Sequence, residues 1–167
     1  MALGTFAEAA AHGEVVVNAT ASAVSLEALE RAGEENLSGK VLMDVSNPLD
    51  FSKGMPPTLS VVNTDSLGEQ IQRRFPEARV VKTLHTTNAR VMVDPARLAG
   101  GDHTVFVGGD DPEAKAVVTD LLRSFGWSDI VDLGDITTAR GTEMMLPVWV
   151  RLFGALEKPL FNFKIVR

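Results

Sequence analysis

The 167-residue chain contains no cysteine, which excludes a disulfide framework and any metal site built from thiolates. Its three histidines, His12, His85 and His103, are far apart and show no metal-ligand spacing, so we expect no bound metal. Basic residues are scattered, and the net charge is −6. A nucleic-acid surface requires clustered lysine and arginine, so we expect no nucleic-acid partner.

Long apolar runs are also missing. The longest, Met144 to Val150, is far too short to span a bilayer, and the N-terminus lacks the basic and apolar regions of a secretory signal. We therefore expect a cytoplasmic protein without a membrane partner. The length fits one domain covering residues 1–167.

The chain also lacks the Gly-x-Gly-x-x-Gly turn that opens a dinucleotide-binding fold. The closest glycine pairs, Gly100-Gly101 and Gly108-Gly109, have no third glycine and no following helix start. In the usual strand order 3-2-1-4-5-6, the strand at 15–17 would be the fourth, and its neighbour, strand 1, would be absent. Its outer side would be an apolar edge that can pair with another chain.

Strands and helices alternate in the first half of the sequence. Short apolar runs at 15–17, 41–45 and 79–84 predict strands buried on both faces, and helical patterns occupy 5–11, 22–32 and 66–75. Such alternation indicates a parallel sheet with right-handed crossovers. The predicted fold class is therefore α/β, a truncated Rossmann-like (doubly wound) parallel sheet.

The second half adds further elements. Asp111 is a good N-cap for a helix that begins at Pro112. A longer helix at 138–156 is apolar almost all round from Met144 onward, and Pro147 should kink it or mark a new start. Additional strands are predicted at 104–107, 130–133 and 161–166.

Small polar residues follow the first three strands where each one ends. They are Asn18-Ala19-Thr20, Ser46-Asn47-Pro48 and His85-Thr86-Thr87-Asn88. Ligands bind at the carboxyl ends of strands in open parallel sheets, so we expect these three ends to converge on one cleft. Each polar side chain could instead satisfy backbone groups of its own turn.

Other charged residues have competing interpretations. Arg140, near a helix start, could bind an anion or form an ion pair. Asp132 and Asp135 could be loop carboxylates or an acid/base pair.

From Thr5 to Arg167 the sequence resembles the coenzyme F420-dependent NADP oxidoreductase family. The resemblance rests on the order and spacing of several segments, of which Leu84-His85-Thr86 is the most telling. The chain looks like the family with roughly the first 50 residues removed, the part that carries the glycine-rich turn. The matching segments are Val15 to Thr20, Val41 to Pro48, Lys82 to Thr86, Val105 to Asp111, Asp132 to Gly134, the Arg140 helix and Phe161 to Val166.

This resemblance implies an enzyme that transfers a hydride between NADP(H) and a deazaflavin or flavin-like acceptor such as coenzyme F420. The cofactors carry the chemistry, so no catalytic side chain is expected. Asn18, Ala19 and Thr20 would line the nicotinamide side, and Asn47 and Pro48 would border the deazaflavin pocket. The segment His85, Thr86, Thr87 and Asn88 would form the floor, with His85 donating a hydrogen bond to a ring carbonyl.

Two other functions stay open. One is a non-catalytic binding or assembly module derived from this fold, and the other is a pyrroline-carboxylate-type NAD(P)-dependent reductase. The partners expected are small-molecule cofactors and a second copy of the chain. The homodimer would form through the 144–156 helix, the strand edge at 15–17, or both.

Overall fold

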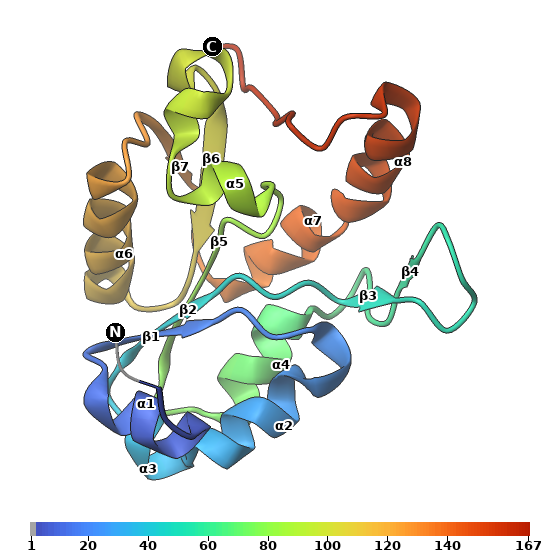
Figure 1. The fold of residues 1–167 in the computed structure, drawn as a ribbon. Coiled ribbons are helices and arrows are strands. Elements are labelled where there is room, and N and C mark those ends of the chain that lie inside the picture. Colours follow the sequence, from blue (N-terminus) through green and yellow to red (C-terminus); the bar gives the residue numbers. More distant parts are fainter. Residues whose placement is uncertain (1–2) are drawn as a thin grey trace.

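The computed structural model describes residues 3–167 and is built around one five-stranded sheet (Figure 1). The strand order is β1-β2-β5-β6-β7. The strands are β1 (Val15–Asn18), β2 (Val41–Asp44), β5 (Arg79–Thr83), β6 (Thr104–Gly108) and β7 (Asp129–Asp132).

The strands β1, β2 and β5 run parallel to one another, as the sequence predicts. The sheet as a whole is mixed, because β6 runs antiparallel to β5, while β7 is parallel to β6. The segment between β5 and β6 holds only one short α-helix, α5 (Ala89–Met92), and two 3-10 turns, η1 (Pro95–Arg97) and η2 (Ala99–Gly101). It contains no long crossover helix, so the chain turns back and β6 runs in the opposite direction.

Helices cover both faces of the sheet, and the alternation of side chains along the strands divides the core into two clusters. Leu42 faces the first cluster with α1 to α4, whereas Val41 and Met43 face the second with α5 and α6. The Rossmann-like α/β class is thereby confirmed. The helices are α1 (Phe6–His12), α2 (Ser22–Ala32), α3 (Glu34–Leu37), α4 (Leu67–Arg74) and α6 (Pro112–Ser124).

Helix starts follow the local sequence. Thr5 and Glu8 form a capping box at the start of α1, and Asp111 accepts a 2.7 Å hydrogen bond from Ala114 N at the start of α6. Ser66 also caps α4 through Glu69 N. The Glu69 carboxylate, however, accepts from the Ser66 hydroxyl rather than from its backbone.

The C-terminal region departs from the prediction in two ways. The expected helix at 138–156 is divided into η3 (Ile136–Thr138), α7 (Ala139–Glu143) and α8 (Leu146–Leu156), with Pro147 in the first turn of α8. Pro147 therefore marks a new start, since it lacks the N–H that a continuous helix needs. Along α8 only Leu146 is buried, so the apolar helix is not enclosed by the rest of the chain.

The predicted strand at 161–166 is wrong. This segment runs beside β6, where Thr104 N donates to Phe163 O at 2.9 Å and Ile165 N donates to the Thr104 hydroxyl at 2.9 Å. One main-chain hydrogen bond does not make a ladder, because the second contact uses a side chain. The segment is therefore extended without being a strand of the sheet.

The long connection between β2 and α4 contains a small hairpin. Its strands, β3 (Leu49–Asp50) and β4 (Thr58–Leu59), pair antiparallel, and the hairpin extends away from the main sheet (Figure 1). In the main sheet β1 is an edge strand, as predicted, and its Val17 is 53% exposed. None of the described helices is long and apolar enough to cross a membrane.

Candidate functional site

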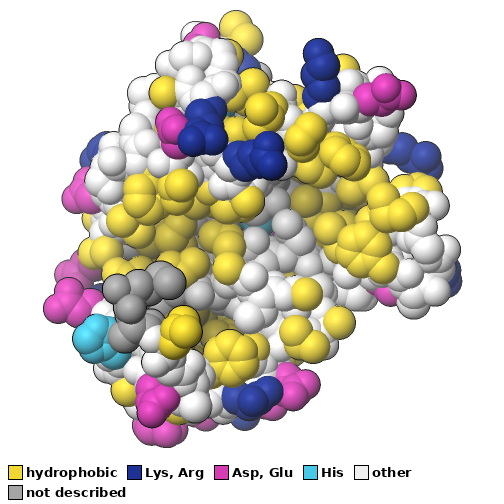
Figure 2. Space-filling view, in the orientation of Figure 1, with side chains coloured by type: hydrophobic (Ala, Val, Ile, Leu, Met, Phe, Trp, Pro, Cys, Tyr) yellow, Lys and Arg dark blue, Asp and Glu magenta, His cyan; other side chains and the backbone are white. Residues whose placement is uncertain are grey.

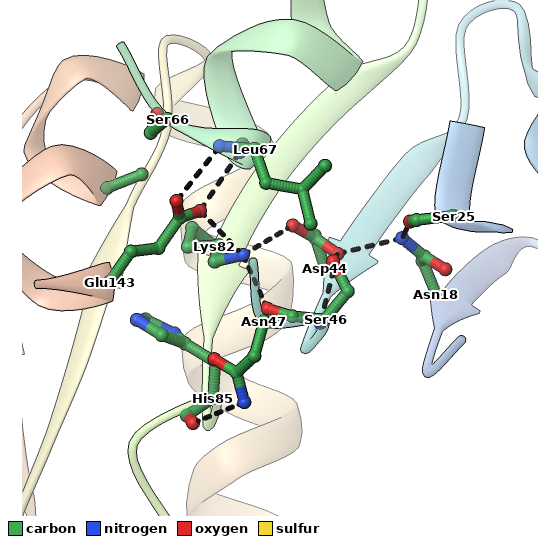
Figure 3. Close-up of polar contacts among 12 residues, drawn as sticks. Asn18, Ser25, Asp44, Ser46, Asn47, Ser66, Leu67, Lys82, His85 and Glu143 are labelled. Carbon is green, nitrogen blue, oxygen red and sulfur yellow. Dashed lines mark hydrogen bonds and ion pairs between the residues drawn. The ribbon is translucent and has the colours of Figure 1, made fainter. Parts of the chain in front are cut away.

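The carboxyl ends of β1, β2 and β5 lie together and are joined by side-chain hydrogen bonds (Figure 3). Asn18 Nδ2 donates to Asp44 Oδ1 at 2.8 Å, linking the first tip to the second. Asn47 Nδ2 donates to the carbonyl oxygen of His85 at 2.9 Å, linking the second tip to the third. The structure thus brings together the three strand ends that the sequence places at a common edge.

A cleft of about 750 Å³ opens beside these strand ends. Its walls come from the start of α2, the segment after β2, the β3 strand with its following turn, and α4. Of the predicted site residues, Ala19, Thr20 and Asn47 line this cleft. The volume is in the range of pockets that hold a cofactor-sized molecule.

The other predicted residues lie behind the cleft rather than in its wall. Asn18, His85, Thr86 and Thr87 are each at most 5% exposed, and Pro48 is also buried. Asn88 is half-buried and caps α5, accepting a hydrogen bond from Arg90 N at 3.0 Å. Asn88 therefore satisfies a backbone group of its own turn, which is the alternative to a ligand-binding role.

Several buried polar atoms near the strand tips have no hydrogen-bond partner within the described residues. They are Asn47 Oδ1, both ring nitrogens of His85 and Thr87 Oγ1. Unpaired buried polar groups are rare in folded proteins, and each one needs a water, an ion or a ligand to satisfy it. Their gathering at the predicted ligand end of the sheet supports a binding role for this region.

A strained turn places His85. Leu84 has a φ of 58°, a left-handed conformation that is unusual for a bulky side chain, and His85 N donates to Thr83 O at 2.7 Å across it. The turn ends β5 abruptly and directs His85 into the protein. Such conformations persist where the surrounding structure enforces them, and they cluster at functional sites.

The imidazole of His85 is electrically neutral in this setting. Burial lowers its pKa well below the ordinary value of 6.5, and the positive charge of Lys82 lowers it further. Backbone groups of Thr83 and Thr142 oppose these effects to a smaller extent. A neutral ring keeps one N–H donor and one acceptor nitrogen, so it can serve a ligand in either role.

A buried ion network that sequence reasoning missed lies beside the strand tips (Figure 3). Lys82 Nζ is 2.8 Å from Asp44 Oδ2 and 2.9 Å from Glu143 Oε1, and all three side chains are at most 2% exposed. Burial alone would lower the pKa of Lys82, but the two carboxylates more than offset it and raise the pKa above its usual value. In the sequence, the only sign of this network is that Asp44 and Lys82 lie within otherwise apolar strands, because Glu143 is remote from both.

The network holds one cation between two carboxylates, and the surplus negative charge is satisfied by hydrogen-bond donors. Asp44 Oδ1 accepts from Ser46 N, from Ser46 Oγ and from Asn18 Nδ2. Glu143 accepts from Leu67 N and Gly68 N at the start of α4, where the helix dipole also favours a negative charge. The whole group is therefore paired, as a buried charge requires.

The remaining charged candidates are engaged in contacts within the chain. Arg140 forms a two-point ion pair with Glu69, at 2.8 Å and 2.5 Å, which is the ion-pair alternative of the sequence analysis. Asp132 pairs with Lys115 at 3.0 Å. Asp135 accepts hydrogen bonds from the hydroxyl and the backbone N–H of Thr137, and these are the main reason that the pKa of Asp135 is lowered.

Comparison with known proteins identifies the family. A candidate F420-dependent NADP reductase from Arthrobacter sp. FB24 has a crystal structure that matches 97% of this chain and 74% of its own, with 68% sequence identity and a TM-score of 0.95. The chain belongs to the F420-dependent NADP reductase family. No protein-family model matches it.

More distant matches include a named member of this family and a solved structure that shares the fold. The F420-dependent NADP reductase of Methanocaldococcus jannaschii is 29% identical over 146 residues, which are 87% of this chain. The chain spans only 64% of the length of that relative. Plasmodium falciparum pyrroline carboxylate reductase with NADP bound is 17% identical, with a TM-score of 0.54 over 93% of this chain and 53% of its own. A likeness at that level of identity shows a shared fold.

Proposed function

We propose that this chain is part of an enzyme that transfers a hydride between NADP(H) and a deazaflavin or flavin-like acceptor such as coenzyme F420. The observation that carries the proposal is the cleft at the tips of β1 and β2, with unpaired polar atoms of Asn47, His85 and Thr87 beside it. The proposal is supported by membership of a family whose named relatives are F420-dependent NADP reductases.

The residues fit the ring ends of both cofactors. Ala19 and Thr20 are small and would let a flat nicotinamide approach the tip of β1 closely, with Asn18 supporting them from behind. Asn47 would offer its unpaired Oδ1 to the deazaflavin, beside Pro48 and the hairpin that begins at β3. When bound, the two cofactors supply the hydride chemistry, and the protein holds and orients them.

The segment after β5 would form the floor of the ring site. His85 carries an unpaired ring N–H that could donate to a ring carbonyl, and Thr87 carries an unpaired hydroxyl. Thr86 and Asn88 complete the turn, and Asn88 sets the start of α5. Since His85 is 4% exposed and both of its ring nitrogens are buried, the ring would reach a ligand only through a small shift of the surrounding side chains.

The fit to NADP is limited to the nicotinamide end. No Gly-x-Gly-x-x-Gly turn occurs in these 167 residues, and that turn is what cradles the pyrophosphate in this class of fold. We therefore expect the chain to bind F420 more tightly than it binds NADPH.

Calorimetric titration with F420 and with NADPH tests the proposal directly. We expect F420 to bind, and Asn47→Ala to weaken its binding about fivefold, because one hydrogen-bonding side chain contributes on the order of 1 kcal/mol. Asn162→Ala is a matched control, since Asn162 is also a half-buried asparagine with an unpaired Oδ1 but lies beside His103. Absence of F420 binding by the unaltered chain would refute the proposed acceptor.

A non-catalytic binding or assembly module is the second candidate. It is favoured by the lack of the glycine-rich turn and by the exposed edge strand β1. It predicts that hydride exchange between NADPH and F420 is absent while the chain still binds a protein partner along β1. Hydride exchange measured by absorbance separates the two candidates, and tests with cyclic imines address the pyrroline-carboxylate-type alternative.

We also propose a cytoplasmic homodimer. Hydrophobic side chains gather in two broad areas on either side of a hollow on the face shown in Figure 2. Val148, Phe153 and Leu156 of α8 are 54%, 41% and 48% exposed, and Val17 lies on the open edge of β1. Light scattering should show a dimer that Val148→Glu weakens, whereas Val117→Glu, on α6, leaves it intact.

A further inference from the structure

We propose that the Asp44–Lys82–Glu143 network is the positioning element of the cleft. It would hold Ser46 and Leu67 in place, and through the neighbouring Asn47 it would set the main chain at His85. The inference deepens the function proposed above, because the cleft it concerns is the same one.

The network holds Ser46 through all of its polar atoms. Asp44 Oδ1 accepts from Ser46 N at 3.1 Å and from Ser46 Oγ at 2.6 Å, and Lys82 Nζ donates to Ser46 O at 2.7 Å. Ser46 lines the cleft and is the residue before Asn47. The position of Asn47 therefore follows from contacts made by the network.

Asn47 connects this region to His85. Asn47 is itself outside the ion network, and its amide donates to the carbonyl oxygen of His85. That carbonyl follows the strained turn at Leu84, where the main chain needs support from its surroundings. A displaced Asn47 would release the carbonyl and allow the turn, with its imidazole, to relax.

Glu143 connects the network to the opposite wall of the cleft. Glu143 on α7 binds Leu67 N at 2.9 Å and Gly68 N at 3.1 Å, and Leu67 lines the cleft across from the tips of the strands. The two carboxylates of the network thus hold segments from both walls. A role in stability alone would not require this, since apolar residues of similar volume serve stability as well as a buried ion pair does.

Nuclear magnetic resonance of the whole chain tests the inference without any cofactor. The signals to follow are the Asn47 side-chain amide and the ring nitrogens of His85, with those of His103 as an internal reference. In Ser46→Ala we expect both Asn47 and His85 signals to shift, and hydrogen exchange of the Asn47 amide to accelerate about tenfold, because a hydrogen bond to a charged group is lost.

A second variant guards against loss of the fold. Glu143→Gln keeps an oxygen acceptor for the start of α4 but removes the charge beside Lys82, and it should shift the signals of Leu67, Asn47 and His85. Ser124→Ala removes an exposed hydroxyl that only bonds to Leu121 O, so it should shift none of them. Asn162→Ala should move His103 signals alone, since Asn162 Nδ2 contacts His103 Nδ1 at 2.8 Å.

The inference is overturned if Asn47 and His85 signals stay unchanged in both Ser46→Ala and Glu143→Gln while those variants unfold more easily. Its failure is distinguishable from failure of the proposed function, which is decided by F420 titration of the unaltered chain. Shifts at Asn47 and His85 in a chain that binds no F420 would support the positioning network and refute the acceptor.

Discussion

Replacing Lys82 by methionine tests the energetics of the buried network. Methionine keeps most of the hydrocarbon length of lysine, so the cavity it leaves is small and the change is mainly the loss of charge. Asp44 and Glu143, both at most 1% exposed, would then face each other without the cation that now lies within 2.9 Å of each. Breaking a buried ion pair from one side costs about 3–5 kcal/mol.

That loss is large compared with the stability of an ordinary domain, which is about 5–15 kcal/mol. With a denaturant dependence of about 2 kcal/mol per molar urea, the unfolding midpoint of Lys82→Met should fall by roughly 2 M. Urea titration at pH 7 followed by circular dichroism measures this shift directly.

Neutralising the partners provides the internal check. Adding Asp44→Asn and Glu143→Gln to Lys82→Met removes the two uncompensated charges and should restore about half or more of the lost stability, because buried amides cost far less than buried carboxylates. The reasoning is refuted if Lys82→Met costs less than about 1 kcal/mol, or if the triple variant is less stable than the single one.

Three further predictions concern packing and pH. Gly109→Ala would place its Cβ 2.5 Å from the backbone oxygen of Val80 and should cost about 1–3 kcal/mol in thermal unfolding, whereas Gly141→Ala meets nothing within 4 Å and should not destabilise the chain. Burial lowers the pKa of His85, so its neutral state favours the fold above pH 6.5 and this stability is lost as the pH falls below 6.5. Urea midpoints at pH 7.5 and 5.5 should therefore differ less in His85→Gln than in the unaltered chain, and equal differences would contradict this. Hydrogen bonding by Thr104, followed by Lys164 and Arg167, lowers the pKa of Asp129 from 3.8 to about 2, so the stability it contributes is present above pH 3.8 and is lost as the pH falls through about 2. Asp129→Asn should flatten the acid limb of the stability curve in that window.

Much of the fold could be read from local patterns. The apolar runs before Asn18, before Ser46 and before His85 are short and alternate with helical patterns, so their parallel pairing follows from chain connectivity. The same alternation carries polar residues to one edge of the sheet, and the three strand tips do meet there. Capping residues such as Thr5 and Asp111 also act through contacts within four residues.

Local patterns fail to predict the structure where the outcome depends on distant segments. The alternating residues 161–166 look like a strand, but whether they pair depends on the edge of β6, which offers them one main-chain hydrogen bond. The antiparallel direction of β6 depends on where the preceding connection packs. Local periodicity contains neither kind of information.

The sequence by itself determined which residues alternate, where helices begin, and which polar residues end the parallel strands, because these features depend on neighbours in the chain. Only the tertiary structure decided how those residues are used. It buried His85 instead of placing it in the cleft wall, and it joined Lys82 to Asp44 and to Glu143, which comes 61 positions later. Charge pairing acts through space, and a buried charge must find its partners wherever the packed helices and strands carry them.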